Sequence, residues 1–244
     1  YLTPREDGLP ARLGGSLERM ASLRYGENPQ QRAALYVTEE PRGIRDLKQR
    51  QGKELSFNNI LDLDAAMAAV APWPTRPACA IVKHNNPCGV ARAETLADAY
   101  HKAYMADRVA AFGGCIAVNR PVDKATAEEM VGLFLEVIVA PSFHDEALKV
   151  FAAKKNLRVV ELPVSHGEQG LDYKCVRGGF LVQDRFQFDP SEEGWRVPTV
   201  RHPTEAEWSD LRFGWAGVAT VKSNAILLVR HEAAIGIGAG QMSR

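Results

Sequence analysis

The sequence lacks an excess of charge of either sign and lacks any long apolar run. Its 244 residues carry 30 Lys and Arg against 30 Asp and Glu, so the formal net charge is zero. Proteins that bind nucleic acid usually show a basic excess or a dense Lys/Arg stripe, and neither is present. No apolar stretch approaches the roughly 18 residues that span a bilayer, and the polar start has no signal-peptide core. The composition therefore predicts a cytoplasmic protein that binds neither nucleic acid nor membrane.

Cysteine is also scarce. The four cysteines are Cys79, Cys88, Cys115 and Cys175, and their spacing matches neither a metal site nor a disulfide framework. We expect reduced thiols. With no general positive field, an anionic ligand must be held by a few placed cations and backbone amides.

Short apolar runs alternate with helical patterns in the first two thirds of the chain. Residues 1–32 look irregular. Strands are predicted at 78–83, 115–119, 136–141 and 157–163, and helices at 57–73, 95–107, 124–134 and 145–154. Strands of four to seven residues between helices of about ten or more indicate a layered α/β fold.

The rhythm changes after residue 172. Two short runs that meet at Gly178-Gly179 predict a hairpin over 173–185, and 186–203 resembles a linker. A capping-box pattern at Thr204 and Glu207 opens a helix to about residue 221, and strands follow at 224–230 and 233–240. We therefore divide the chain into a first α/β subdomain with its N-terminal part, residues 1–195, and the start of a second, 196–244.

The segment "AIVKHNNPCG" (80–89) places an ammonium beside an imidazole at the end of a buried strand. Neighbouring side chains on a strand point to opposite faces, so Lys83 and His84 can serve one site only if the backbone turns there. Asn85-Asn86-Pro87 predicts such a turn. An imidazole can act as a general base, and an ammonium can stabilise negative charge on oxygen. A solvated lysine and a hydrogen-bonded histidine are the alternative that spacing alone leaves open.

A zinc site is a second possibility, because His-x-x-Pro-Cys-Gly is faintly similar to the motif of zinc deaminases. Their pattern is His-x-Glu followed by Pro-Cys-x-x-Cys. Here Asn86 stands at the glutamate position and Ala91 at the position of the second cysteine. The ligand set is therefore incomplete, and no metal is predicted.

Three further segments carry weaker signals. In "LRYGENPQQ" (23–31), Arg24 can fork onto a phosphate or carboxylate, and the paired glycines of "AFGGCIAVN" (111–119) allow a ligand close to the backbone. Asn224 in "VKSNA" lies at a helix-to-strand junction. The Gly-x-Gly-x-Gly of "IGIGAGQMSR" (235–244) is neither a dinucleotide fingerprint nor a P-loop. Taken singly, each segment is equally consistent with an ordinary loop or turn.

Taken in order, these segments resemble one family. The motifs are "LRYGENPQQ", "QGKELSFNNILDLDAA" (51–66), "AIVKHNNPCGVA" (80–91), "AFGGCIAVNRPVD" (111–123), "FLEVIVAP" (134–141), "RGGFLVQDR" (177–185), "VKSNAI" (221–226) and "GIGAGQMSR" (236–244). They are similar to the formyltransferase part of the bifunctional purine biosynthesis proteins. That family pairs phosphoribosylaminoimidazolecarboxamide formyltransferase with inosine monophosphate cyclohydrolase. The similarity runs from about residue 17 to residue 244.

The resemblance implies a reaction in purine (IMP) biosynthesis. The 5-amino group of aminoimidazole carboxamide ribonucleotide attacks the formyl carbon of the co-substrate 10-formyltetrahydrofolate. That amine is a poor nucleophile, so the step needs a base and a cation for the tetrahedral oxyanion. By resemblance, His84 is the general base and Lys83 the oxyanion stabiliser, and the chemistry needs no metal.

The resemblance also implies the substrate-binding positions and the fold. The residues that match nucleotide-contacting positions of the family are Arg24, Tyr25, Gly113, Glu136, Asn224 and Arg244. The implied fold is a pair of cytidine-deaminase-like α/β subdomains without zinc, the second of them incomplete in this sequence.

Extent is the main departure from the family. The cyclohydrolase part that precedes this region in relatives is absent from the sequence, and relatives continue beyond Gln-x-Ser-Arg. Their site is shared across a homodimer, so the resemblance implies a homodimer or a complementary C-terminal chain as partner. The alternative is a non-catalytic nucleotide-binding or assembly fragment that keeps the motifs without turnover.

Overall fold

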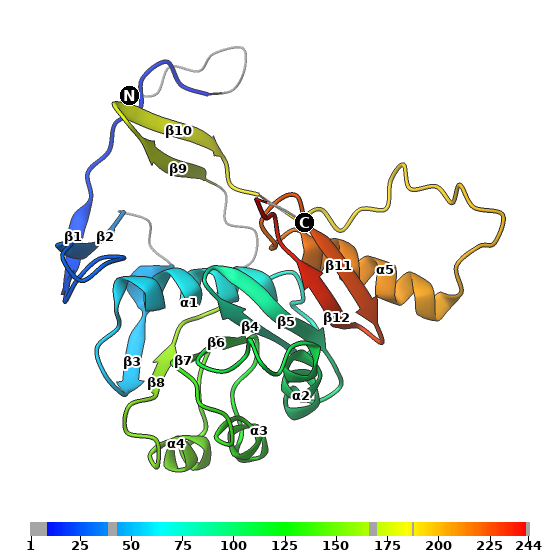
Figure 1. The fold of residues 1–244 in the computed structure, drawn as a ribbon, viewed down its shortest axis with the longest axis horizontal. Coiled ribbons are helices and arrows are strands. Elements are labelled where there is room, and N and C mark those ends of the chain that lie inside the picture. Colours follow the sequence, from blue (N-terminus) through cyan, green and yellow to red (C-terminus); the bar gives the residue numbers. More distant parts are fainter. Residues whose placement is uncertain (1–8, 39–42, 166–169, 187, 243–244) are drawn as a thin grey trace.

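The core of the protein is an eight-stranded mixed sheet (Figure 1). The computed structural model describes residues 9–38, 43–165, 170–186 and 188–242. The strand order is β11-β12-β5-β4-β6-β7-β8-β3, parallel from β6 to β8 and antiparallel elsewhere. The strands are β3 (Lys48–Gln51), β4 (Ala78–Lys83), β5 (Asn86–Arg92), β6 (Cys115–Val118), β7 (Val137–Ala140), β8 (Arg158–Glu161), β11 (Ile226–Arg230) and β12 (Ala233–Gly238). The predicted layered α/β class is confirmed.

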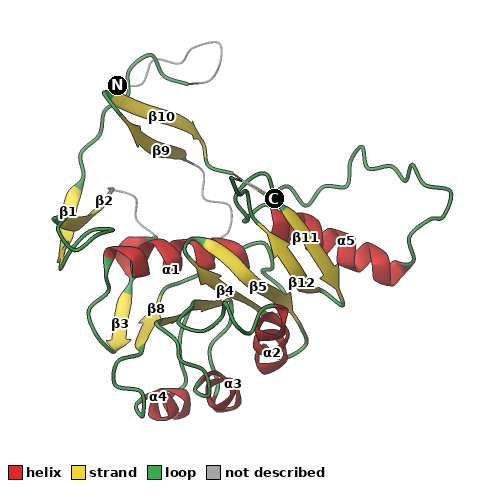
Figure 2. Ribbon diagram, viewed as in Figure 1, coloured by secondary structure: helices red, strands yellow, loops and turns green. Residues whose placement is uncertain are grey.

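Helices cover both faces of this sheet (Figure 2). They are α1 (Phe57–Val70), α2 (Leu96–Ala106), α3 (Lys124–Met130), α4 (Asp145–Phe151) and α5 (Glu205–Val218). On β4, Cys79 and Ile81 pack with α2, α3 and α4, whereas Ala80 and Val82 pack with α1 and α5. Because the central strands β6 and β7 are buried on both faces, they are apolar at every position and show no alternation.

Side-chain caps fix where the longest helices begin. Ser56 with Asn59 and Thr204 with Glu207 form complete capping boxes at α1 and α5. The Thr95 side chain accepts from the backbone N–H of Asp98 at α2. Each cap satisfies N–H groups that the first helical turn leaves unpaired. The Thr95 and Thr204 patterns predicted the starts of α2 and α5, whereas α1 was predicted from the helical spacing of its apolar residues.

Two small hairpins lie outside the large sheet. β1 (Glu18–Leu23) pairs with β2 (Ala33–Val37), and a short 3-10 helix, η1 (Ile44–Asp46), precedes β3. The prediction that residues 1–32 are irregular is wrong at β1. The residues of β1 are largely exposed, so its sequence lacks the alternation of apolar and polar residues that marks a half-buried strand. The predicted hairpin near Gly178-Gly179 is confirmed as β9 (Leu171–Val176) and β10 (Gly179–Asp184), which stand apart from the sheet in Figure 1.

The turn after β4 differs from its prediction. Asn85-Asn86-Pro87 was expected to form it, but the two connecting residues are His84 and Asn85, and β5 starts at Asn86. A strand containing proline was not expected there. Pro87 is accommodated because the β4–β5 register shifts at this point, and proline is tolerated at such bulges.

The C-terminal hairpin was predicted as two strands around His231-Glu232, and this is confirmed. It extends the large sheet, because Ala233 pairs with Ala91 of β5 and the N–H of Arg92 donates to the Glu232 carbonyl at 3.0 Å. The predicted linker at 186–203 contains no helix or strand in its described residues. The division at residue 195 and the deaminase-like subdomains remain predictions.

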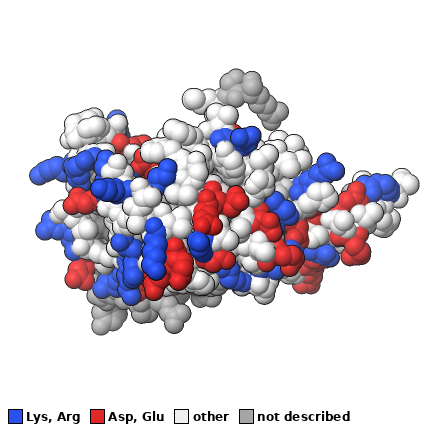
Figure 3. Space-filling view, turned by 90° about the horizontal axis from the view of Figure 1, so that it is seen from below, with Lys and Arg blue, Asp and Glu red and all other residues white. Residues whose placement is uncertain are grey.

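The surface carries both signs of charge. On the face that Figure 3 shows, Lys and Arg are interspersed with Asp and Glu. Among the described residues, no helix combines the length and the apolar character that crossing a bilayer requires.

An ion network fastens the β11–β12 hairpin to the sheet. The Glu232 carboxylate accepts from Arg76 at 2.6 Å, from Arg92 at 2.6 Å and from the Ser209 hydroxyl at 2.5 Å. Burial of this carboxyl acts to raise its pKa, but the hydrogen bonds from Arg92 and Ser209 and the two arginine charges outweigh it, so the pKa lies below the usual value. The ionised form of Glu232 is therefore favoured by folding.

We expect Glu232→Gln to lower the free energy of unfolding by about 1–3 kcal/mol at pH 7, since it leaves two partly buried arginines without their carboxylate. A pKa that is lower in the folded chain gives stability that is present above the ordinary value of 4.5 and is lost as the pH falls through the folded-state value. Denaturant unfolding across this range should show wild type and variant converging below pH 4.5. Glu94→Gln is the control, because Glu94 pairs with Arg76 but its side chain is 85% exposed. If Glu232→Gln lowers the free energy of unfolding no more than Glu94→Gln does, Glu232 does not fasten the hairpin to the sheet.

Candidate active site

The β4–β5 hairpin presents Lys83 and His84 at one end of the sheet. Lys83 is the last residue of β4 and follows Cys79 and Ile81 on the face of α2, α3 and α4. His84 follows with a φ of +54° and Asn85 with +61°, the sign pattern of a type I′ turn. Lys83 is half-buried and His84 exposed. The turn that the two side chains need in order to serve one site therefore exists, beginning at His84.

The Lys83 ammonium is held by the loop before β6. Its Nζ donates to the Phe112 carbonyl at 2.8 Å. The next residue, Gly113, has a φ of +73° and donates its N–H to the Phe134 carbonyl at 2.8 Å. Glycine adopts this left-handed conformation without a steric penalty, which explains the residue type at position 113. The loop thus places Gly113 next to the lysine.

Glu136 is joined to the same loop through the backbone. Its N–H donates to the Gly114 carbonyl at 3.1 Å, immediately before β7 begins. Its carboxylate Oε2 pairs with Arg158 of β8 at 2.6 Å, and Arg158 also donates to the Glu54 carbonyl. The Arg158 side chain is only 11% exposed, whereas that of Glu136 is 40% exposed. The carboxylate is therefore fixed in position while remaining open to solvent.

Asn224 reaches this region from the opposite end of the sequence. The Asn86 side chain accepts from the backbone N–H of Lys222 at 3.1 Å, which ties the segment before β11 to the β4–β5 hairpin. The Lys222 carbonyl in turn accepts from Gly240 at 2.8 Å. A Cβ at Gly240 would lie 2.3 Å from the Ser223 carbonyl oxygen, so only glycine fits there. These contacts hold the exposed Asn224 loop beside the turn.

Arg24 and Tyr25 form a separate pair. The Arg24 guanidinium lies over the Tyr25 ring, 4.9 Å from its centroid, and donates to the phenol oxygen at 3.2 Å. Their loop contacts the start of α1, where the Asn58 amide donates to the Glu27 carbonyl at 3.4 Å. One helical turn later, Asp62 accepts from the N–H of Asn85 at 2.7 Å. Helix α1 therefore connects this loop to the hairpin.

The predicted residues are only partly brought together. Direct contacts or short runs of backbone link Lys83, His84, Gly113, Glu136 and Asn224 into one region. In the described part of the chain, no hydrogen bond or ion pair joins Arg24 or Tyr25 to Lys83 or His84, and helix α1 is their connection. Arg244 lies outside the described residues.

Four residues that hold this region were not identified from the sequence: Asp62, Asn86, Arg158 and Lys222. Asp62 and Asn86 occur inside quoted motifs, but their spacing gives no sign of a contact. Asn86 and Lys222 are 136 positions apart. Only the three-dimensional pairing of the two hairpins shows their role.

The cysteine in this hairpin is a poor metal ligand. Burial raises the pKa of the Cys88 thiol to about 11, and its sulfur lies 3.5 Å from the Ile81 carbonyl as a donor. A zinc ligand must be a thiolate, which this environment disfavours. Within the described ranges, no group of three or more His, Cys, Asp and Glu side chains is placed to hold a metal ion.

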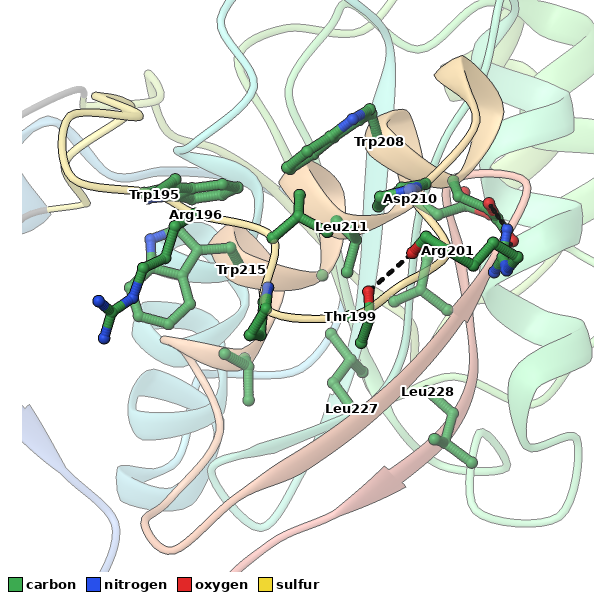
Figure 4. A pocket seen from close by; sticks show the side chains of 17 residues that line it. Trp195, Arg196, Thr199, Arg201, Trp208, Asp210, Leu211, Trp215, Leu227 and Leu228 are labelled. Carbon is green, nitrogen blue, oxygen red and sulfur yellow. Dashed lines mark hydrogen bonds and ion pairs between the residues drawn. The ribbon is translucent and has the colours of Figure 1, made fainter.

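An open pocket of about 800 Å³ lies elsewhere, between the 195–203 segment, α5 and β11 (Figure 4). Trp195 stacks on Trp208, with ring centroids 6.1 Å apart, and meets Trp215 edge-on at 6.2 Å. Two of the charged residues here pair with each other: the hydrogen bond from Arg201 lowers the pKa of Glu207 to about 2. This pocket offers apolar surface but no free base beside a cation, so it is a weaker candidate for catalysis.

The arrangement around the β4–β5 turn suits proton removal at a nucleophile next to a developing oxyanion. Lys83 brings a fixed ammonium and His84 brings an imidazole, which is free of hydrogen bonds and ion pairs to other described side chains. Gly113 and Glu136 are linked to Lys83 through the 112–114 loop, and the Asn224 loop is linked to the hairpin through Asn86, so a close backbone, a carboxylate and an amide belong to the same region. Such groups recognise a polar heterocycle by hydrogen bonding.

Comparison with known proteins shows the family of the chain. The family model described as "AICARFT/IMPCHase bienzyme" matches residues 1–244. The bifunctional purine biosynthesis protein PurH of Cereibacter sphaeroides is 52% identical over 228 residues, which cover 91% of this chain and 43% of that protein. PurH of Bacillus subtilis is 49% identical, covering 96% of this chain and 46% of its own length, and PurH of Synechococcus elongatus is 48% identical, covering 100% and 48%. The chain thus spans a little less than half the length of these relatives.

Proposed function

Because the chain belongs to the AICARFT/IMPCHase bienzyme family, we propose that it represents the formyltransferase part of these proteins. The reaction is transfer of a formyl group from 10-formyltetrahydrofolate to the 5-amino group of aminoimidazole carboxamide ribonucleotide. The observation that carries the proposal is the β4–β5 turn, where a fixed Lys83 ammonium and an unengaged His84 imidazole belong to consecutive residues at the end of β4.

In the proposed step, the amine nitrogen forms a bond to the formyl carbon. His84 takes the proton from that nitrogen, and Lys83 stabilises the oxyanion of the tetrahedral intermediate. The bond between the formyl carbon and N10 of the folate then breaks, with its electron pair left on N10. That nitrogen takes up the proton that the amine lost, so the products are the formamide and tetrahydrofolate.

The remaining site residues are proposed to bind the ribonucleotide. Gly113 brings main chain close to the heterocycle, while the Glu136 carboxylate and the Asn224 amide are suited to its polar atoms. Arg24 and Tyr25 are proposed contacts of the nucleotide from the α1 side, and Arg244 a partner of its phosphate. Folate contacts are expected to come also from a second copy or a complementary C-terminal chain.

A formyl-transfer assay tests the proposal directly. The purified chain is mixed with the ribonucleotide and 10-formyltetrahydrofolate, and formylated nucleotide and tetrahydrofolate are measured together. We expect both products in equal amounts, with none when unformylated tetrahydrofolate replaces the donor. The assay is repeated with a complementary C-terminal chain.

Ribonucleotide binding without turnover in either assay would favour a non-catalytic nucleotide-binding fragment. Absence of both binding and turnover would show that the proposed function is wrong.

A further inference from the structure

The turn that carries His84 has an unusual backbone for its sequence. Both connecting residues adopt left-handed conformations, with φ of +54° and +61°, and neither is glycine. Such two-residue turns favour Asn-Gly or Gly-Gly, and histidine at the first position is not among the preferred residues. The local sequence alone therefore does not hold this turn, and an outside contact must contribute.

Asp62 of helix α1 supplies that contact. Its Oδ1 accepts the backbone N–H of Asn85 at 2.7 Å, and the Asp62 side chain is half-buried. With the Asn85 amide oriented so that its nitrogen faces α1, it also donates to Asp62 Oδ1 and to the Leu61 carbonyl, each at 3.2 Å. A carboxylate acceptor makes these hydrogen bonds stronger than those of a neutral group.

A second left-handed turn in the chain is held by a helical aspartate in the same way. The turn between β11 and β12 consists of His231 and Glu232, again left-handed with φ of +53° and +57°. Asp210 of helix α5 accepts both of their N–H groups, at 3.0 and 2.7 Å. Asp62 and Asp210 each lie six residues after the N-cap of a 14-residue helix that begins with a capping box.

The two turns differ in what else holds them. Glu232 is also clamped by Arg76 and Arg92, whereas Asn85 occupies the corresponding position in the first turn. Among the described residues no ion pair fastens the first turn. Helix α1, through Asp62, thus supports the two residues of the first turn. The second turn is held by Asp210, by the arginine clamp on Glu232 and by Lys102, whose Nζ donates to the His231 carbonyl at 3.1 Å.

We propose that Asp62 is a positioning residue, which holds the left-handed turn and so fixes the direction in which the His84 imidazole faces the reacting amine. The inference deepens the proposed function and rests on it. Asp62 acts through the backbone of Asn85 and does not touch the substrate. Small displacements of a reacting group are enough to lower a rate strongly, which makes this support matter for turnover.

Asp62→Ala should lower turnover in formyl transfer by about ten- to hundredfold, the fold-change that corresponds to losing a hydrogen bond to a charged acceptor. The dissociation constant of the ribonucleotide should stay within about threefold, because the binding residues are unchanged. Asp210→Ala is the matched control. It removes the carboxylate that accepts the N–H groups of the second turn, and it should leave turnover within about twofold.

Glycine at position 85 provides the decisive rescue. Glycine adopts positive φ without help from outside, so adding Asn85→Gly to Asp62→Ala should restore turnover to within about threefold of wild type. Failure of this rescue, with the double variant folded, would mean that Asp62 acts on the reaction directly, and the positioning role would be wrong. Asp62→Asn keeps an acceptor oxygen and should stay within about fivefold of wild type. If Asp62→Ala does not fold, a loss of turnover in Asp62→Asn as large as the loss in a His84→Ala variant overturns the proposal.

Amide hydrogen exchange separates this inference from the proposed function. Exchange at Asn85 should become about tenfold or more faster in Asp62→Ala, while Asp210→Ala should instead affect the amides of His231 and Glu232. This measurement needs no turnover. A wild-type chain that neither binds the ribonucleotide nor transfers formyl, with or without a complementary C-terminal chain, would refute the proposed function alone. Unchanged exchange at Asn85 in Asp62→Ala would refute the role of Asp62.

Discussion

Replacing His84 with alanine is expected to reduce formyl transfer by about 10²–10⁴, the range for removing a general acid or base. The reason lies in the state of the imidazole. His84 is exposed at the tip of the β4–β5 hairpin, and within the described residues no hydrogen bond or ion pair engages its ring. The Asn86 amide contacts its main-chain carbonyl instead, at 3.4 Å. The ring is therefore available to take the proton of the attacking amine.

Steady-state kinetics combined with binding would check this expectation. The dissociation constant of the ribonucleotide should change by only a few-fold, since the role assigned to His84 is proton transfer. Added imidazole should restore part of the rate if a missing base is the cause of the loss.

The chain offers a matched control in His231, which is exposed in the equivalent left-handed turn between β11 and β12. His231→Ala should retain full turnover. Equal losses in the two variants would point to hairpin stability as the cause, and comparable turnover in His84→Ala would remove the general-base role.

Much of the fold was predictable because its signals are local. The strand at 78–83 is a continuous apolar run, as a strand buried on both faces must be, and its bounds were predicted correctly. The starts of α1, α2 and α5 follow from caps whose partners lie three residues away. Signals of this kind need no knowledge of the rest of the chain.

The parts of the fold that were predicted wrongly depend on contacts between residues far apart in the sequence. Asn86 and Pro87 disfavour a strand, so β5 could not be predicted; the bulge opposite Val82 is what accommodates the proline. The turn forms at His84 and Asn85 partly because Asp62, 23 positions away, accepts the Asn85 N–H. The sequence singled out Lys83 and His84 as the candidate pair, which stays a prediction, but it gave no sign of the tertiary contacts that support them.

The candidate site residues were assigned through resemblance more than through chemistry, and they stay predictions. Arg24, Gly113 and Asn224 each occur in segments that suit ordinary loops equally well. The structure brings Gly113 to Lys83 through the Phe112 carbonyl, and it brings the Asn224 loop to the hairpin through Asn86. Such convergence of separate segments is the expected property of a binding site, and it is what isolated motifs do not reveal.

The second large effect is expected from Lys83→Met, which keeps most of the length and the apolar stem of the side chain but removes the ammonium. An ammonium has three donors. One is used at the Phe112 carbonyl at 2.8 Å, which fixes the position of Nζ. The other two can meet an oxyanion that forms beside the turn. Turnover should fall by roughly 10²–10³, the usual scale for losing one oxyanion donor, with little change in ribonucleotide affinity.

Lys102→Met is the matched control for this variant. Lys102 is, like Lys83, a half-buried lysine whose Nζ donates to a main-chain carbonyl, that of His231, at 3.1 Å. Its loss should leave turnover within about twofold, because it removes a comparable surface contact without removing an oxyanion donor. An unchanged rate in Lys83→Met would take Lys83 out of the mechanism. If Lys83→Met weakens ribonucleotide binding but leaves the rate of the bound complex unchanged, Lys83 binds the substrate and takes no part in the chemical step. An interaction made equally in the ground state and in the transition state changes affinity alone.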